Sequence, residues 1–438
     1  MKRSTQRILT SHVGSLIRPP EVLDHLRAKQ KRSGFNEDRF AATLKTTVAE
    51  VVKQQADVGI DIPSDGEFGK GISWSQYALE RLSGFERRPV KPGTPDPFAR
   101  GVDRERFAEF YAELDARDGR ATISDSVCVG PIRYTGMSEL QRDISNFKAA
   151  MALHGVEEGF LPVAAPSSVI PDRKNEYYAS DEKCLEAIAE AMRVEYKTIV
   201  DAGLILQLDD ARAAVTYDRM VPPGTLRDFR KWVGMHVEVL NHALKGIPED
   251  RVRYHVCWGS WPGPHVTDVP LKDIVDLILK VKAGAYVIEG ANPRHEHEWH
   301  VWGDVKMPDS KILLPGVISH VTNVVEHPEL VAERITRLAK HLGRERIIAS
   351  TDCGFAQGPF HRRVHPSVMW AKFEALAAGA KIASDVLWKR SGKASAAKAA
   401  KPAKTVKRAA KPAKKAGTKK TGAKKTGAKK STPKRSAR

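Results

Sequence analysis

The strongest constraint on the fold is a regular alternation of strand-like and helix-like segments between residues 184 and 382. Short apolar runs typical of buried strands are separated by longer stretches with the apolar spacing of amphipathic helices. The strand-like runs are residues 204–208, 252–256, 285–288, 311–314 and 346–349, and the helix-like stretches are residues 184–202, 226–244, 271–282, 329–342 and 368–382. Repeated β-α units of this kind favour an α/β fold, either a parallel barrel or a doubly wound sheet.

Polar residues that can take part in catalysis follow these strands in order. The residues at or just beyond a predicted strand end are Asp209, His255, Cys257, Glu289 and Cys353. Sites built from the ends of many strands are typical of a (β/α)8 barrel, whereas a doubly wound sheet places its site at one switch point behind a glycine-rich turn. The chain contains no G-x-G-x-x-G or Walker motif. The sequence therefore predicts a (β/α)8 TIM barrel in residues 1–390.

The C-terminal segment, residues 391–438, has a different composition. It holds 18 of the 72 Lys and Arg residues and none of the 53 Asp and Glu residues, so residues 1–390 carry a net charge of only +1. The segment is rich in Lys, Ala and Pro and has almost no large apolar side chains, so burial cannot offset the entropy of ordering it. We expect a basic tail that is disordered from about Gly392. Two interpretations of the tail fit: non-specific contact with nucleic acid, or a solubilising extension.

Cysteine usage and the N-terminal composition indicate a reducing compartment. The four cysteines, Cys128, Cys184, Cys257 and Cys353, are too few for a disulfide framework. Residues 1–7 lead into no apolar segment, and no stretch approaches the ~18 apolar residues that a membrane span requires. We therefore expect a cytoplasmic protein without membrane contact, in which Cys128 and Cys184 are structural.

One histidine, two cysteines and one glutamate are candidate metal ligands. In an extended strand the side chains of residues i and i+2 point to the same face, so His255 and Cys257 can converge on one ion. A His-x-Cys pair alone is more often packed or hydrogen-bonded than a metal site. Glu289 and Cys353 at later strand ends make a metal site more favourable than a packed pair. Together the four residues supply one imidazole, two thiolates and one carboxylate, a donor set that suits zinc. Zinc held by thiolates can bind and deprotonate a further thiol, which indicates sulfur chemistry.

Seven short motifs follow one another between residues 8 and 385. In order they are Val13-Gly14-Ser15, Asp65-Gly66-Glu67, Gln207-Leu208-Asp209-Asp210, His255-Val256-Cys257, Ile288-Glu289, Pro315-Gly316-Val317 and Asp352-Cys353-Gly354. Taken together they resemble the cobalamin-independent methionine synthase family. The resemblance implies a (β/α)8 barrel with a zinc ion held by His255, Cys257, Glu289 and Cys353. It also implies an amino-acid pocket in which Glu67 and Asp209 bind the α-amino group and Ser15 receives the α-carboxylate.

The resemblance predicts a zinc-dependent methyltransferase that transfers a methyl group to the thiol of homocysteine, forming methionine. Longer family members add a second, N-terminal barrel that helps to hold folate, and residues 161–168 lack the folate-stacking tryptophan that the family carries there. The methyl donor is therefore left open between a methylated folate and a corrinoid protein. Two other functions are alternatives: alkyl transfer to another small thiol such as coenzyme M, and a nucleic-acid-associated protein that acts through its basic tail.

A second group of histidines lies in residues 294–300. A second metal site is the less favoured interpretation, because no cysteine lies nearby and closely spaced histidines in a polar loop are often solvated. We expect this loop to contact substrate or to cover the site. His320, which follows the Pro-Gly-Val motif, is a further candidate for a residue that faces the substrate or the methyl donor.

Overall fold

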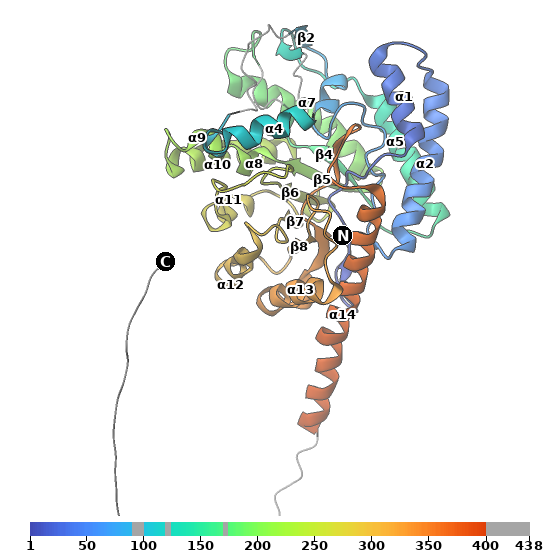
Figure 1. The fold of residues 1–438 in the computed structure, drawn as a ribbon, viewed down its shortest axis with the longest axis vertical. Helices are drawn as coiled ribbons and strands as arrows, with labels where there is room; N and C mark the ends of the chain where they lie inside the picture. The colour runs from blue at the N-terminus through green and yellow to red at the C-terminus, as the bar shows by residue number, and fades with distance from the viewer. Residues whose placement is uncertain (90–99, 119–123, 170–173, 400–438) are drawn as a thin grey trace, which may run out of the picture. The chain divides into compact units, whose positions relative to one another are not determined.

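The centre of the molecule is a curled, seven-stranded parallel sheet (Figure 1). The computed structural model describes residues 1–89, 100–118, 124–169 and 174–399. The strand order is β1-β9-β8-β7-β6-β5-β4, and every neighbouring pair is parallel. The strands are β1 (Leu9–Thr10), β4 (Phe160–Ala164), β5 (Ile205–Asp210), β6 (Val252–Val256), β7 (Ala285–Ile288), β8 (Ile312–Ile318) and β9 (Ile348–Thr351). The predicted α/β class with a parallel sheet is confirmed.

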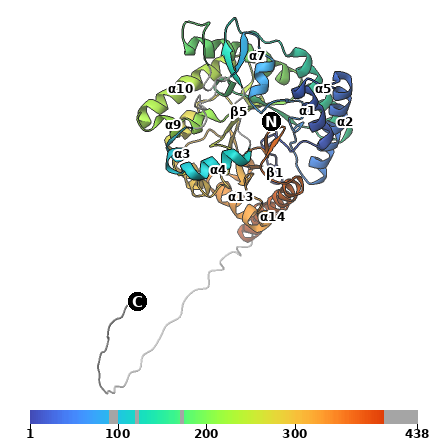
Figure 2. The same ribbon diagram turned by 45° about the horizontal axis from the view of Figure 1, so that its top comes forward.

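Helices follow the strands and surround the sheet (Figure 2). The outer helices are α1 (Pro20–Lys31), α2 (Glu37–Asp57), α5 (Met137–Leu153), α7 (Asp181–Asp201), α10 (Leu226–Ala243), α11 (Val275–Ile278), α12 (Val301–Asp304), α13 (Pro328–Leu342) and α14 (Pro366–Ala399). Local sequence sets several of their ends. Ser180 caps α7, Thr225 and Asp228 form a capping box at the start of α10, and α13 ends at Gly343.

The segment formed by residues 60–63 contacts both edge strands of the sheet. Ile62 pairs in parallel with Ser11, and its N–H donates to the carbonyl of Thr10 at 3.1 Å. On the other side, the N–H of Phe160 in β4 donates to the carbonyl of Pro63 at 3.1 Å. The two edges of the sheet are therefore brought together through this segment.

Apolar side chains form two separate clusters, one on each face of the sheet. Alternate residues of β7 and β8, such as Val287 and Leu314, belong to a small cluster that also contains Cys257 and Cys353. Their neighbours along the chain belong to the large cluster shared with the helices, as the two-residue period of a strand requires. The small cluster fills the inside of the curled sheet, below the candidate site.

Two short antiparallel pairs and several short helices complete the described part of the chain. The pairs are β2 (Phe85–Pro89) with β3 (Ser124–Cys128), and β10 (Ala356–Gly358) with β11 (His361–Arg362). The short helices are α3 (Val102–Arg106), α4 (Ala108–Asp118), α6 (Pro166–Val169), α8 (Arg212–Val215) and α9 (Tyr217–Met220), with 3₁₀ turns at η1 (Gln76–Glu80), η2 (Glu249–Arg251), η3 (Leu271–Asp273), η4 (Glu296–His300) and η5 (Arg344–Arg346).

The last helix differs from its prediction. Helix α14 continues to Ala399, past residue 382 where the prediction ends it and past Gly392 where the disordered tail is expected to begin. Ala and Lys, which predominate in residues 393–399, have high intrinsic helix propensity, which favours continuation of the helix. Residues 400–438 of the predicted tail lie outside the described residues. Packing divides the chain into a unit of residues 1–392 and a unit of residues 393–438.

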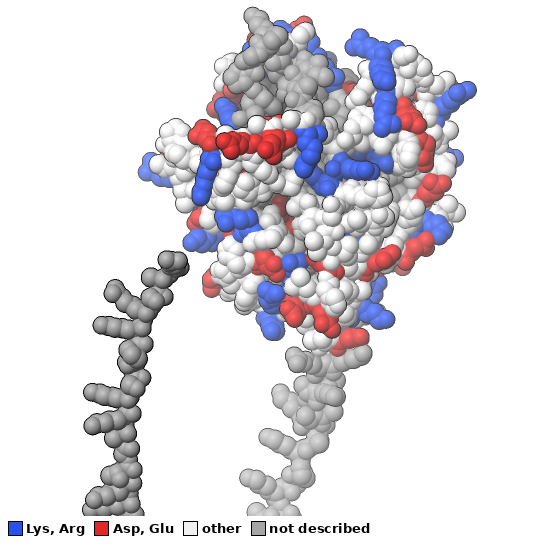
Figure 3. Space-filling view, in the orientation of Figure 1, with Lys and Arg blue, Asp and Glu red and all other residues white. Residues whose placement is uncertain are grey.

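Charged side chains of both signs are interspersed on the face shown in Figure 3. This distribution agrees with the net charge of +1 in residues 1–390. Within the described ranges, none of the helices combines the length and the hydropathy that crossing a bilayer would require.

Candidate active site

Three of the predicted metal ligands converge at the C-terminal edge of the sheet. His255 is in β6, Cys257 follows that strand and Cys353 follows β9. One ligand atom from each residue lies within 4.8 Å of the other two, and all three side chains are buried. The two Sγ atoms are 3.6 Å apart. Residues separated by 96 positions in the chain thus form one cluster, as strand ends at the same edge of a parallel sheet allow.

The geometry of this cluster fits a tetrahedral metal ion. The Sγ–Sγ distance of 3.6 Å far exceeds the ~2.05 Å of a disulfide. It is close to the ~3.8 Å that separates two thiolates at ~2.3 Å from one tetrahedral zinc ion. Nδ1 of His255 lies 3.2 Å from the carbonyl of Val287, while its Nε2 has no hydrogen-bond partner among the described residues. A buried imidazole oriented through one nitrogen, with the other nitrogen free, is the usual arrangement of a metal-binding histidine.

The pKa values of the two thiols are shifted in opposite directions. Contact with Cys353 raises the pKa of Cys257 well above its usual value, and burial adds to this effect. Contact with the Cys257 thiol lowers the pKa of Cys353 well below its usual value, although burial opposes the change. Cys257 therefore stays protonated, and Cys353 is the better thiolate ligand before any metal binds.

Glu289 lies outside the group of three but close to it. It follows β7, and its Oε1 accepts the N–H of Trp258 at 2.9 Å. Its Oε2 is buried and has no hydrogen-bond partner among the described residues. Burial raises the pKa of Glu289 to about 8, and the negative charge of Asp352 adds to the effect. This unpartnered oxygen belongs to a side chain that interacts electrostatically with Cys257 and Cys353, so Glu289 is suited to be a fourth ligand once it is ionised.

Glu67 has a strained backbone that neighbouring groups hold in place. Its φ of 62° lies in the left-handed region, which a residue other than glycine rarely adopts. The side chain of Asp65 accepts the Glu67 N–H at 2.9 Å, and Arg18 donates to the Glu67 carbonyl at 2.6 Å. Oε2 of Glu67 forms an ion pair with Nζ of Lys70 at 3.2 Å, without the angle of a hydrogen bond. The carboxylate thus keeps acceptor capacity for a substrate cation.

Asp209 and Asp210, adjacent at the end of β5, point to opposite faces of the sheet and have different partners. Asp209 is in register with His255 on β6 and accepts a hydrogen bond from Gln207 at 2.8 Å. Burial raises the pKa of Asp209 to about 7. Asp210 instead accepts the hydroxyl of Tyr254 at 2.9 Å and the N–H groups at the start of α8. Asp209 therefore faces the cluster, whereas Asp210 supports the fold.

Ser15 lies beside this pocket, but its hydroxyl is occupied. It donates to the carbonyl of Ala356, and its own carbonyl accepts the N–H of Phe355 at 2.8 Å. Gly14 has a φ of 131°, and a Cβ there would lie 2.6 Å from the ring of Pro162. The neighbouring N–H groups are engaged as well, since Gly14 donates to Nδ1 of His12 and Leu16 donates to the carbonyl of Gly66, each at 3.1 Å.

His320 is buried just beyond β8 and is held through one of its two ring nitrogens. Its Nε2 lies 2.8 Å from Oγ of Ser260, and Nδ1 has no hydrogen-bond partner among the described residues. Burial lowers the pKa of His320 to about 4, so the ring is neutral at pH 7. The ring thus keeps one nitrogen without a partner among the described residues, and the substrate-facing role of His320 stays a prediction.

The sequence does not predict the buried ion pair between Lys372 and Glu326, which supports the segment that carries His320. Lys372 in α14 is fully buried and lies 2.8 Å from Oε2 of Glu326, whose Oε1 accepts the N–H of Ser319 at 2.8 Å. One sequence pattern could have indicated that Lys372 is buried. Its helical spacing places it on the same face of α14 as the buried residues Met369 and Leu376.

The histidines of residues 294–300 are only partly solvated. His297 and His300 are exposed, as expected of a polar loop. His295 is buried, with one nitrogen 2.9 Å from Asp268 and the other 2.9 Å from Glu298. Across the described residues, the group at His255 is the single compact cluster of three or more metal-ligating side chains.

The sequence and the fold of the chain are similar to those of several known proteins. No protein-family model matches it. A methionine synthase of Sulfolobus acidocaldarius is 24% identical over 348 residues, which cover 79% of this chain and 85% of that protein. An uncharacterised protein of Bacillus subtilis, YxjH, is 24% identical over 387 residues, which cover 86% of this chain and 94% of that protein. Among solved structures, a B12-independent methionine synthase from Shewanella sp. W3-18-1 in complex with selenomethionine matches with a TM-score of 0.63 at 18% identity, over 87% of this chain and 99% of that chain.

The fold and the site define an α/β protein with a buried imidazole and two cysteine sulfurs at the C-terminal edge of a parallel sheet. The sequence relatives and the matching fold confirm the resemblance that the motifs predict. The chain is similar in sequence to proteins named methionine synthase, and in fold to B12-independent methionine synthases.

Proposed function

We propose that the chain is a zinc-dependent methyltransferase that transfers a methyl group to the thiol of homocysteine and so forms methionine. The observation that carries the proposal is the convergence of His255, Cys257 and Cys353, with an unpartnered imidazole nitrogen and two sulfur atoms 3.6 Å apart. Relatives named methionine synthase support the same activity.

We also propose that residues 60–63 act as the eighth strand of a closed (β/α)8 barrel. Hydrogen bonds from this segment to both edge strands, and the apolar cluster inside the sheet, support closure. A barrel brings all its strand ends to one rim, which accounts for the meeting of ligands from distant parts of the chain.

In this proposal His255, Cys257, Glu289 and Cys353 hold the zinc ion. A zinc ion bound there lowers the pKa of an added thiol, so that the substrate sulfur is a thiolate at neutral pH. Glu289 is the ligand most easily released, because a carboxylate yields its place more readily than a thiolate. Its hydrogen bond from the backbone N–H of Trp258 would hold the Glu289 side chain in place whether or not it is bound as a ligand.

The acceptor pocket holds the two charged ends of an amino acid. Glu67 and Asp209 bind the α-amino group, and the turn at Ser15 receives the α-carboxylate. Buried carboxylates need cationic partners, and a substrate ammonium supplies one. His320 faces the reacting groups as a neutral imidazole. The methyl donor in this proposal is a methylated folate or a corrinoid protein.

A second acceptor is favoured by one observation. The ion pair between Lys70 and Glu67, at 3.2 Å, already neutralises part of the charge that would bind an ammonium group. An acceptor thiol without an amino group, such as coenzyme M, would leave this pair intact.

The test separates the metal from the acceptor. The purified full chain is expected to bind about one zinc ion per molecule, and Cys353→Ser is expected to lose most of it. Cys128→Ser is the matched control, because Cys128 is buried away from the cluster and should leave the zinc content unchanged. Equal zinc content in both variants would refute the ligand assignment. X-ray absorption then identifies the acceptor: homocysteine should add one sulfur to the metal, and a change with coenzyme M alone would favour the second acceptor.

A further inference from the structure

His295 lies at a buried junction between two loops that follow β6 and β7. We call residues 257–270 the β6 loop and residues 289–300 the β7 loop. Nδ1 of His295 is 2.9 Å from Oε2 of Glu298, and Nε2 is 2.9 Å from Oδ2 of Asp268. An ionised carboxylate can only accept, so both ring nitrogens carry protons and the ring is an imidazolium. Burial alone would lower the pKa of His295, but the bonds to Asp268 and Glu298 raise it to about 10.

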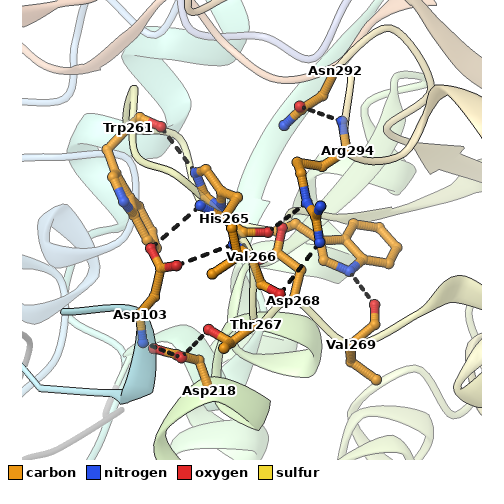
Figure 4. Close-up of polar contacts among 12 residues, drawn as sticks. Asp103, Asp218, Trp261, His265, Val266, Thr267, Asp268, Val269, Asn292 and Arg294 are labelled. Carbon is orange, nitrogen blue, oxygen red and sulfur yellow. Dashed lines mark hydrogen bonds and ion pairs between the residues drawn. The ribbon is translucent and has the colours of Figure 1, made fainter. Parts of the chain in front are cut away.

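Further polar contacts surround His295, one within the β6 loop and two that run from the β7 loop to the β6 loop or to the residue just beyond it. The second oxygen of Asp268 lies 3.2 Å from Nδ1 of His265, in the β6 loop. Arg294, in the β7 loop, donates to the carbonyl of His265 at 2.8 Å (Figure 4). Oε1 of Glu298 accepts the N–H of Leu271, just beyond the β6 loop, at 2.7 Å. His295 is thus the central cation of a polar seam that fixes one loop against the other.

The β6 loop is in turn fixed on its other side. Asp103 of α3 accepts the N–H groups of His265 and Val266 at 3.3 and 3.0 Å, and Asp218 accepts the hydroxyl of Thr267 (Figure 4). The β6 loop therefore cannot compensate for a lost contact by moving freely.

The seam reaches the candidate metal centre through one tryptophan. The ring of Trp258 packs on His295 with 4.8 Å between ring centroids, and its ring N–H donates to the carbonyl of Val269 at 2.8 Å. The backbone N–H of the same Trp258 holds Oε1 of Glu289 at 2.9 Å. His295 therefore supports the residue that orients Glu289.

The positive charge of His295 also supports Glu289, in addition to the packing of His295 on Trp258. Of the charged groups that act on buried Glu289, Asp352 and Cys353 are negative, and His295 is positive. An imidazolium close to a buried carboxylate offsets the repulsion from its negative neighbours.

We propose that His295 is a positioning residue for the candidate metal centre, which orients Glu289 through Trp258 and balances the charge of the site. The inference rests on the proposed function, because it takes Glu289 as the fourth ligand. It assigns to the histidine-rich loop a role in support of the metal centre, in place of a second metal.

The test uses two histidines from the same loop in the full chain. His295→Gln removes the buried imidazolium, and His297→Gln is the matched control because His297 is exposed. Zinc affinity is measured by competition with a chromophoric chelator, without thiol or methyl donor. We expect about 10- to 100-fold weaker binding for His295→Gln, the usual effect of removing a group that supports a ligand, and wild-type binding for the control.

Cobalt(II) in place of zinc gives a readout that separates positioning from loss of fold. The sulfur-to-cobalt charge-transfer bands report Cys257 and Cys353 and should persist in both variants. The d–d bands report the whole ligand set and should change only in His295→Gln. Wild-type affinity and unchanged d–d bands in His295→Gln would overturn the proposal.

A second variant keeps the test decisive if His295→Gln does not fold. Glu298→Gln retains an acceptor for Leu271 and removes one negative partner of His295, so a smaller loss of zinc affinity is expected. No loss in that variant would overturn the proposal. If the wild-type chain itself binds no zinc, the proposed function fails; if it binds zinc and neither variant changes the affinity, only the role of His295 fails.

Discussion

Replacing Lys372 with methionine should destabilise the folded chain by more than any surface change on the same helix. Lys372 is fully buried, and its Nζ donates to Oε2 of Glu326 at 2.8 Å and to the carbonyl of Val324 at 2.5 Å. Methionine keeps most of the side-chain volume, so no large cavity forms and the electrostatic effect is isolated. Removing one partner of a buried ion pair costs about 3–5 kcal/mol, because the other charge stays buried and unpaired.

The assay is urea unfolding followed by tryptophan fluorescence. Lys372→Met should lower the free energy of unfolding by about 3 kcal/mol or more. Lys381→Met, at an exposed position of the same helix, should change it by less than ~0.5 kcal/mol. The double variant Lys372→Met with Glu326→Leu should recover part of the loss, because it leaves no unpaired charge.

Two results would refute this reasoning. A loss of less than about 1 kcal/mol in Lys372→Met would mean that the pair is solvated or unimportant. A double variant as unstable as the sum of the single variants would mean that the two side chains act independently. Because Glu326 also holds the N–H of Ser319, the loop carrying His320 should become more mobile in Lys372→Met, which hydrogen exchange can measure.

Three further predictions concern backbone space and pH. Gly316→Ala should lower the free energy of unfolding by about 1–3 kcal/mol, because its Cβ would lie 2.0 Å from Oδ1 and 2.7 Å from Cα of Asp352; wild-type stability on denaturant unfolding would contradict this. Gly234→Ala, inside α10 with nothing within 4 Å of the new Cβ, should raise that free energy by up to about 1 kcal/mol, and a lower melting temperature would disprove the expectation. Burial, aided by the charge of Asp143, raises the pKa of Asp65 from 3.8 to about 7. The folded state therefore binds more protons than the unfolded state between these values, and stability falls as pH rises through this window, by at most about 1.4 kcal/mol per pH unit. Asp65→Asn should reduce this slope but not abolish it, because the pKa values of Asp209 and Glu289 are raised in the same way. Equal slopes for wild type and variant in urea unfolding at several pH values would show that Asp65 makes no contribution.

Much of the fold can be predicted from the sequence because strands and helices have different apolar periods. The alternation in residues 184–382 correctly predicts a parallel α/β sheet and places polar residues at the strand ends. It does not predict where α14 ends, because a Lys- and Ala-rich segment has helix propensity without an apolar face to mark its limit. Nor does it predict that residues 60–63 form hydrogen bonds with both edge strands of the sheet, because these strands are distant in the sequence.

The sequence by itself determined which chemical groups reach the edge of the sheet. A two-residue period requires that Asp209 and Asp210 point to opposite faces, and the same period requires that His255 and Cys257 share one. Which face points inward depends on the curl of the sheet and its pairing with neighbouring strands. Only the tertiary structure therefore decided that Asp209 faces the cluster while Asp210 bonds to Tyr254.

Tertiary structure also decided which charges are buried. Lys372 and Glu326 are 46 residues apart, and His295 and Asp268 are 27 apart, so their pairing leaves no local pattern. A charged side chain alone predicts exposure, since burying it without a partner is costly. These residues can be buried because each forms an ion pair with a residue from a distant segment. Such pairs exist only in the folded chain.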